Sequence, residues 1–375
     1  MSITVGAIGL RQRASVDEAG RITFDDGSAP LDWWIGAADR WHTPPEEKSL
    51  RQRRVGGAPV METMVRVPAG DVVQRVYVAA AFGGVVVVEI DNQSPEPVAV
   101  AFSRSDIVCG RAASVTPPPG ITLPPESAIY PVTHRTTLRA AIGAVDVAAL
   151  GSLPAAGAVA SGWAAHVNRG SRYELPDDAA MESVIADRAA VVLDPLPSVR
   201  EAPSEFLLAV GERSRMGDDV TAYVEHVAEA AQRAAKIGQG YALGAAAEVM
   251  RAAGELRAAA DIERIAARHK LATQYVSETP AARLAGLRDS LVDDSDPWID
   301  LAPAFPAAWY GQSVSAFDVP SRFGRVSYGV RWHGERPALL WDIEGAGDVS
   351  VRASSLDPAW RSADRRGDAL LSAPR

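Results

Sequence analysis

Aromatic and charged side chains with complementary chemistry lie close together near the start of the chain, in the segment LDWWIGAADRWHTPPEE. The candidate ligand-binding residues are Trp33, Trp34, Asp39, Arg40, Trp41 and His42. Indole rings stack on the C–H faces of a sugar, while its hydroxyl groups require paired donors and acceptors such as a guanidinium group and a carboxylate. These residue types together indicate a candidate carbohydrate-binding site.

A structural interpretation of the same residues is the one we favour. Tryptophans near the start of a β-domain commonly fill the space between two packed sheets. Asp39 and Arg40 are adjacent in the sequence and can form a local ion pair, which contributes little stability when it is exposed to solvent. The sequence alone leaves both interpretations of the segment open.

The elements that must position this segment lie between Pro59 and Arg104. This stretch has the densest apolar patterning of the chain. Alternation of apolar and polar residues predicts strands, and an almost unbroken β-branched run predicts a strand covered on both faces. The predicted strands are Val60–Val67, Val72–Val78, Val85–Ile90 and Val98–Phe102. We expect them to form a four-stranded meander, one face of a β-sandwich against which the tryptophan-rich segment packs.

The overall charge argues against nucleic acid as a partner. The chain of 375 residues has a net charge of −9 and an isoelectric point near 5.3, whereas neutralising phosphates requires a concentrated basic surface. The basic cluster of the sequence is Arg51–Arg54, which follows Glu46 and Glu47 closely. We expect this cluster to be a solvated loop.

Cys109 is the only cysteine, which excludes an intramolecular disulfide bond and a cysteine-rich metal site. No histidine pairs obviously with it, so we expect a buried structural thiol rather than a nucleophile. No stretch reaches the roughly 18 apolar residues of a membrane span, and the start of the chain lacks the pattern of a secretory signal. We therefore expect a cytoplasmic protein that uses no cofactor, metal or membrane.

Helical periodicity replaces strand alternation after Pro176. The stretch from Trp163 to Tyr173 still reads as extended, and Pro176–Asp178 then supplies a proline and two acids suited to a first helical turn. Alanine-rich helices follow to about Leu291, as in packed helical hairpins of a reduced toroid or a solenoid. We expect the acids of this region mostly on helix surfaces or in caps, namely Glu182, Glu201, Glu205, Glu212, Glu225, Glu229, Glu248, Glu255 and Glu263.

A last change in composition occurs at Asp293–Pro297, beyond which strand patterns return. His333–Pro337 is predicted to join the two longest of these runs as a hairpin. The sequence therefore predicts an α+β protein in three parts. These are an N-terminal antiparallel β-sandwich over residues 1–175, a central α-helical hairpin array over 176–292 and a small C-terminal antiparallel β-domain over 293–375.

Three segments of the chain carry a resemblance to known proteins. They are VVVVEIDNQSPEPVAVAFS, GWAAHVNRGSRYELPDDAAMESVIADRAAVVL and RFGRVSYGVRWHGERPALLWDIEG. Together with the order of parts, they resemble bacterial glycoside hydrolases with a six-hairpin α/α toroid, such as glucoamylase-like, phosphorylase-like and rhamnosidase-like enzymes. In that family the toroid is several times longer and contributes carboxylates on loops at one end of its helices. Glycoside cleavage needs two acids set across the bond, and no acid of the central region here lies in an aromatic loop.

The resemblance without those carboxylates implies a non-catalytic relative that binds carbohydrate or serves as an interaction scaffold. One alternative is a glycoside hydrolase or phosphorylase with a site where sandwich and helices meet, built from Asp32, Asp39, Arg40 and His42 with a helical carboxylate. Another is a protein-docking scaffold formed by the helical hairpins. The expected partner is accordingly a carbohydrate or a protein.

Overall fold

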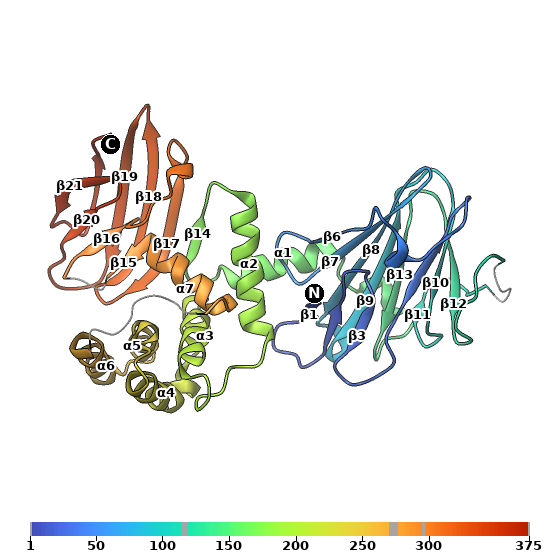
Figure 1. The fold of residues 1–375 in the computed structure, drawn as a ribbon, viewed down its shortest axis with the longest axis horizontal. Helices are drawn as coiled ribbons and strands as arrows, with labels where there is room; N and C mark the ends of the chain where they lie inside the picture. Colours follow the sequence, from blue (N-terminus) through green and yellow to red (C-terminus); the bar gives the residue numbers. More distant parts are fainter. Residues whose placement is uncertain (1, 115–118, 270–276, 295–296, 374–375) are drawn as a thin grey trace. The chain divides into compact units, whose positions relative to one another are not determined.

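The chain has an α+β fold, with sheets in its N-terminal part, helices in the middle and strands again towards its C-terminus (Figure 1). This class is the one predicted from the sequence. The structure, a computed structural model, describes residues 2–114, 119–269, 277–294 and 297–373.

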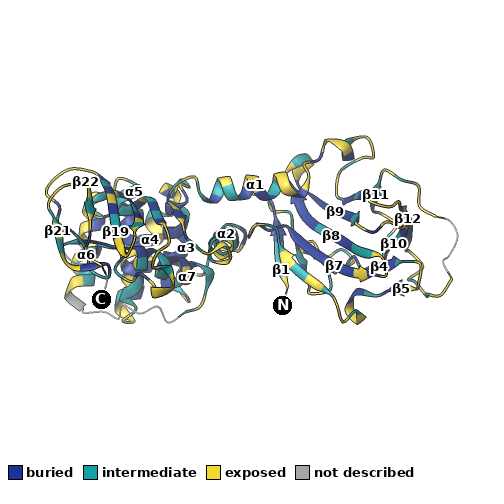
Figure 2. Cartoon of the chain, turned by 90° about the horizontal axis from the view of Figure 1, so that it is seen from above, coloured by how far each residue is buried: buried dark blue, intermediate teal, exposed yellow. Residues whose placement is uncertain are grey.

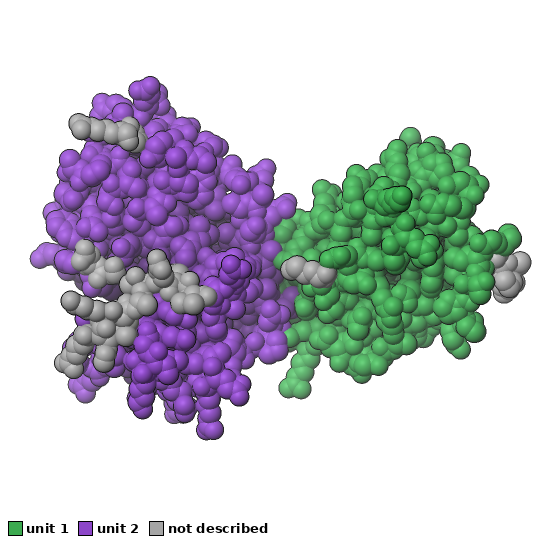
Figure 3. Space-filling model, viewed as in Figure 1, with its two compact units in different colours: residues 1–164 green, residues 165–375 purple. Residues whose placement is uncertain are grey.

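Two units make up this fold, residues 1–164 and residues 165–375 (Figure 3). The division falls inside helix α1 (Ala156–Val167). The helices after α1 and the C-terminal strands, predicted as separate parts meeting near residue 292, belong to one unit. Each unit is described below by itself.

Unit 1 is a β-sandwich of three antiparallel sheets. Its strands are β1 Ile3–Gly6, β2 Arg13–Val16, β3 Ile22–Phe24, β4 Trp33–Gly36, β5 Trp41–His42, β6 Arg51–Arg54, β7 Met61–Val67, β8 Gly70–Ala79, β9 Val85–Asn92, β10 Val98–Phe102, β11 Val108–Cys109, β12 Ala128–Val132 and β13 Thr137–Ile142. The six-stranded sheet has the order β11-β13-β9-β8-β7-β6, and the four-stranded sheet has the order β12-β10-β4-β5. A bridge between Ile22 and Leu31 connects the three-stranded sheet β1-β2-β3 to the segment that leads into β4.

Three of the four strands predicted between Pro59 and Arg104 pair as expected. β7, β8 and β9 are consecutive antiparallel neighbours, with Val65 opposite Val72 in the first pair. The fourth predicted strand, Val98–Phe102, is present as β10, but its predicted place in the meander is wrong, because it pairs with β4 and β12 instead. Alternation in a sequence specifies which side chains share a face, but it does not specify the partner strand.

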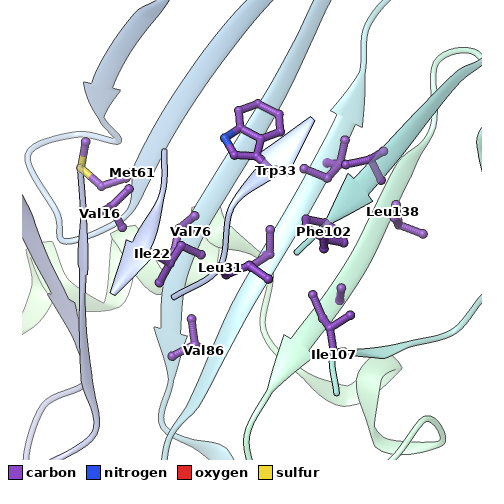
Figure 4. Packing of buried hydrophobic residues seen from close by; sticks show 14 of the residues in the cluster. Val16, Ile22, Leu31, Trp33, Met61, Val76, Val86, Phe102, Ile107 and Leu138 are labelled. Carbon is purple, nitrogen blue, oxygen red and sulfur yellow. The ribbon is translucent and has the colours of Figure 1, made fainter. Parts of the chain in front are cut away.

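Buried β-branched and aromatic side chains from all three sheets form one hydrophobic core (Figure 4). Val16 and Ile22 come from the three-stranded sheet, Trp33 from the four-stranded sheet, and Met61 and Val86 from the six-stranded sheet. Figure 2 shows burial running along β8 and β9. Burying a side chain of this size stabilises the fold by about 1.5–3 kcal/mol, so this core holds the two layers of the sandwich together.

The basic cluster Arg51–Arg54 is an edge strand, β6, and its prediction as a solvated loop is wrong. Its pairing with β7 places Arg53 opposite Glu62, and Arg53 Nε donates to Glu62 Oε2 at 2.7 Å. Arg75 Nε donates to the other oxygen of Glu62 at 2.6 Å. Burial alone would raise the pKa of Glu62, but the hydrogen bonds from Arg75 and Arg53 hold it below its ordinary value. Arg53 of the cluster and Arg75 of β8 together therefore neutralise a carboxylate of β7.

Unit 2 contains the remaining helices, which Figure 1 labels in the middle of the chain. They are α2 Asp178–Leu193, α3 Pro203–Arg215, α4 Val224–Lys236, α5 Leu243–Ala252, α6 Leu256–His269 and α7 Pro280–Leu291. The predicted start at Pro176–Asp178 is confirmed, because the Asp177 side chain caps α2 by accepting from Ala179 N at 2.9 Å. The extended stretch predicted from Trp163 to Tyr173 is wrong at its start, since Trp163 lies in α1.

The strands of unit 2 form two sheets. They are β14 Arg172–Glu174, β15 Val292–Asp293, β16 Ile299–Leu301, β17 Val314–Ser321, β18 Gly324–His333, β19 Arg336–Glu344, β20 Val351–Ala353, β21 Asp357–Ser362 and β22 Arg366–Leu370. One sheet has the order β14-β17-β18-β19-β22, and the other has the order β15-β16-β20-β21 with β16 and β20 parallel. The predicted hairpin at His333–Pro337 is confirmed, with His333 opposite Arg336.

A fully buried charge network joins three helices of unit 2. Arg188 of α2 donates through Nε to Glu212 Oε1 of α3 at 2.8 Å, and Arg215 Nη2 donates to Glu248 Oε2 of α5 at 2.7 Å. Glu212 Oε2 also lies 3.3 Å from Arg215 Nη1, which links the two pairs. Arg188 additionally donates to the backbone oxygen of Ser171 at 2.8 Å, beside β14.

The positions of Glu212 and Glu248 differ from those predicted. Both were expected mostly on helix surfaces or in caps, but Glu212 is 1% and Glu248 5% exposed. Buried carboxylates require a partner because desolvation of an isolated charge is very unfavourable. The network therefore fixes the mutual arrangement of α2, α3 and α5.

We expect Glu212→Ala to lower the free energy of unfolding of unit 2 by about 3–5 kcal/mol, because it leaves Arg188 buried without its carboxylate partner. The matched control is Glu229→Ala on the surface of α4, whose pair with Arg233 is exposed and should contribute less than about 1 kcal/mol. Urea unfolding followed by hydrogen–deuterium exchange of unit 2 peptides measures both values. Equal losses in the two variants would contradict the role of the network.

Candidate functional site

The β4–β5 hairpin positions four of the six candidate ligand-binding residues on opposite faces of its sheet, and Asp39 and Arg40 lie in the turn between the strands. Ile35 pairs with His42 and Gly36 pairs with Trp41 across the hairpin. Because side chains alternate along a strand, Ile35 and His42 point towards the core, while Gly36 and Trp41 point outwards. Trp34 shares the outer face with Gly36 by the same alternation.

Trp33 belongs to the core of the sandwich. Its side chain is 3% exposed, and its indole Nε1 donates to the backbone oxygen of Ala19 at 3.0 Å. Figure 4 shows it among the buried residues of the sandwich. A ligand in solution cannot reach this ring, so Trp33 has the wedge role that the structural interpretation predicts for tryptophans of this segment.

Trp41 lies flat against the sheet on the outer face. A Cβ atom built on Gly36 would be 2.9 Å from Trp41 Cζ2 and 3.0 Å from Cε2, so the indole occupies the space above a residue that has no side chain. Trp34 and Trp41 are both partly exposed. The structure therefore brings two of the predicted tryptophans together on one accessible face.

His42 is 3% exposed and lies between two carboxylates. Its Nδ1 is 3.0 Å from Glu47 Oε1, and its Nε2 is 3.1 Å from Asp39 Oδ1. The carboxylates contact opposite nitrogens of the ring, so they do not share a coordination point for a metal ion.

Arg40 joins the same cluster from the surface. Its Nη1 lies 2.8 Å from Glu47 Oε1 and donates to the backbone oxygen of Trp41 at 3.1 Å. Burial alone would raise the pKa of Glu47, but hydrogen bonds from Arg40 and His42 lower it below its ordinary value. Burial would raise the pKa of Asp39, but the hydrogen bond and charge attraction of His42 together with backbone hydrogen bonds lower it below its ordinary value. Both carboxylates therefore stay ionised near neutral pH.

Glu47 is the member of this cluster that the sequence prediction missed. It stands five residues after His42, and the short helical turn Pro44–Glu46 brings the chain back towards the histidine ring. The two consecutive prolines before it were the available signal, because they fix the direction of the chain within a short distance. The predicted pair of Asp39 with Arg40 differs from the observed contacts, since Asp39 contacts His42 and Arg40 contacts Glu47.

The arrangement has an apolar ring on the outer face of the hairpin and polar groups of both signs held around His42. Asp39 and Arg40 have side chains that are 40% and 54% exposed, whereas the Glu47 and His42 side chains that hold them are 8% and 3% exposed. Cys109, by contrast, is partly buried in β11, and burial raises the pKa of its thiol, which disfavours the nucleophilic thiolate. The chemistry available around Trp41 is thus stacking and hydrogen bonding.

Comparison with protein-family models and with curated proteins finds no match to this chain. Within the residues that the structure describes, no helix combines the length and the apolar character needed to cross a membrane. The same residues contain no group of three or more histidine, cysteine or acidic side chains arranged to hold a metal ion.

We expect Glu47→Gln to destabilise unit 1 at pH 7 by about 1–2 kcal/mol, because the ionised Glu47 has strong hydrogen bonds with Arg40 and His42. The folded-state pKa of Glu47 is depressed, so its contribution is present above the unfolded pKa of about 4.3 and is lost as pH falls through the folded pKa. The difference between wild type and variant should therefore shrink between pH 5 and pH 3, as seen by urea unfolding.

The control for this measurement is Glu46→Gln, a change of the same chemistry at the exposed neighbouring position. It should leave the free energy of unfolding within about 0.5 kcal/mol of wild type. A difference between Glu47→Gln and wild type that stayed constant down to pH 3 would rule out the ionised carboxylate as its origin.

Proposed function

We propose that this protein binds carbohydrate without cleaving it, on the outer face of the β4–β5 hairpin around Trp41. The observation that supports this most strongly is the indole of Trp41 lying flat over Gly36 and partly exposed. A flat aromatic ring on a sheet surface offers its face to the C–H groups of a sugar ring. Trp34, on the same face of β4, extends this aromatic surface.

The turn of the same hairpin carries polar groups that fit a hydroxyl-rich ligand. Asp39 accepts hydrogen bonds and Arg40 donates them, so a pair of neighbouring sugar hydroxyls can engage both. His42 and Glu47 hold these two side chains in place before a ligand arrives. Groups that are already ordered lose less conformational entropy on binding, which favours affinity.

The state of the carboxylates supports binding rather than hydrolysis or phosphorolysis. A general acid for glycoside cleavage needs a raised pKa so that it carries a proton at neutral pH. The pKa values of Asp39, Glu47 and Glu62 are all lowered, and each of these carboxylates is paired with an arginine or a histidine. The enzymatic alternative predicted from the sequence therefore receives less support.

The docking alternative rests on exposed apolar side chains of the helical hairpins. Ile237, at the end of α4, is 59% exposed, and Leu256, at the start of α6, is 67% exposed. Single exposed apolar residues are common on proteins and do not by themselves mark an interface. We therefore place carbohydrate binding ahead of protein docking.

We expect Trp41→Ala to weaken binding of the best ligand found on a glycan array by about tenfold or more, because the variant loses the burial of an aromatic ring against the sugar. Isothermal titration calorimetry of wild type and variant measures the change. Purified protein should leave that glycan intact during the experiment, which chromatography of the recovered ligand verifies.

The matched control is Tyr310→Ala, which removes a 41% exposed aromatic side chain from unit 2 and should leave the affinity unchanged. The proposal fails if no glycan binds, if Trp41→Ala binds as tightly as wild type, or if the glycan is cleaved by wild type and not by a variant of an acidic residue.

A further inference from the structure

A separate hollow of about 390 Å³ opens on the surface of unit 2. The α5–α6 hairpin contributes Arg251, Leu256 and Glu263 to its lining, and the turn between β17 and β18 contributes Arg322 and Phe323. A hollow of this size is within the range that accommodates a small organic molecule. It lies in a different unit from Trp41 and does not depend on the function proposed there.

Arg322 presents a positive charge to this hollow. Its guanidinium carbon lies 4.8 Å from the centroid of the Phe323 ring, and its backbone N–H donates to Asp294 Oδ2 at 2.7 Å. Within the described residues its guanidinium group forms no ion pair with a carboxylate. Stacking on Phe323 orders the group while leaving its N–H donors available to a ligand.

The other charges of the lining leave a net positive charge. Arg251 Nη1 pairs with Glu263 Oε1 within the hollow, so these two groups largely neutralise each other. Among the lining residues that the structure describes, counting Arg251 and Arg322 against Glu263 leaves one positive charge. The hollow therefore favours a ligand with a single negative charge, and Glu263 opposes a second one on the same ligand.

Apolar surface surrounds these charges. Leu256 is 67% exposed at the start of α6, and Pro297 and the Phe323 ring also contribute apolar surface to the lining. Covering exposed apolar surface is favourable by about 25 cal/mol for each Å² removed from water. A ligand with an apolar group would therefore gain affinity that a bare inorganic anion could not.

We propose that this hollow binds a small organic monoanion that carries an apolar group, such as an aromatic or branched aliphatic carboxylate. The carboxylate accepts hydrogen bonds from Arg322 and faces Arg251, and the apolar group packs on Leu256 and Phe323. The ordered guanidinium group supplies two parallel N–H donors, which match the two oxygens of a carboxylate. Affinity is expected to be modest because the hollow is open to solvent.

The test uses the full chain and sodium benzoate as the probe, with titration calorimetry at low ionic strength. Arg322→Gln should weaken benzoate binding by about tenfold, as expected when a charge-assisted hydrogen bond to an exposed arginine is lost. Benzamide, which has the same shape without the charge, should bind wild type at least about tenfold more weakly for the same reason. Raising the salt to 0.5 M should also weaken benzoate binding, because exposed charges are then screened.

Two further variants make the test discriminating. Arg331→Gln removes another exposed arginine, from β18 and outside the lining, and should leave benzoate affinity unchanged. Glu263→Gln removes the opposing negative charge and should tighten binding by about threefold, the effect of a partly screened charge pair.

Three results would overturn the proposal. They are the absence of saturable benzoate binding, equal affinity of wild type and Arg322→Gln, and equal affinity for benzoate and benzamide. Inorganic phosphate serves as a probe of charge alone. Binding of phosphate as tight as that of benzoate would also overturn the proposal, because the apolar surface would then contribute nothing.

Discussion

A carboxylate buried in the interior of this fold must be matched by a compensating partner, and at Glu62 in unit 1 and Glu212 in unit 2 arginine supplies the match. Arg53 and Arg75 hold Glu62 across neighbouring strands of the sandwich. Arg188 holds Glu212 between two helices of unit 2. Because an unpaired buried charge costs several kcal/mol, these pairs exclude arrangements of strands and helices in which the partners are apart. They specify the fold as well as stabilising it.

Features that depend on local pattern could be predicted from the sequence. The β-branched run Val85–Ile90 reads as a covered strand because its composition alone favours that state, and the helices end at Leu291, the last residue of α7, as the helical spacing predicts. The same is true of the hairpin at His333–Pro337, where a short polar turn separates two alternating runs. In the candidate site, the residue types around Trp41 nominate the segment, and its role as a binding site stays a prediction.

Features that depend on distant partners could not be predicted in the same way. Nothing within Val98–Phe102 indicates that β10 pairs with β4 instead of β9, and Arg51–Arg54 is a strand only because β7 lies beside it. Arg188 sits at an apolar position of its helix, a signal that a buried carboxylate is needed, but its partner Glu212 follows 24 residues later. Trp33 and Trp41 lie on opposite faces of the sheet, which follows from strand alternation once the pairing of β4 with β5 is known.

The central position of β9 has a consequence for the nascent chain. One of its neighbours, β8, precedes it directly, but the other, β13, is synthesised only after β10, β11 and β12. Until then one edge of β9 is unpaired, and its residues Val85–Val88, fully buried in the folded sandwich, lie along that edge. An apolar β-branched run with an open edge is prone to pair with other chains. Production of this protein is therefore most vulnerable to aggregation while the chain between Asn92 and Thr137 is being made.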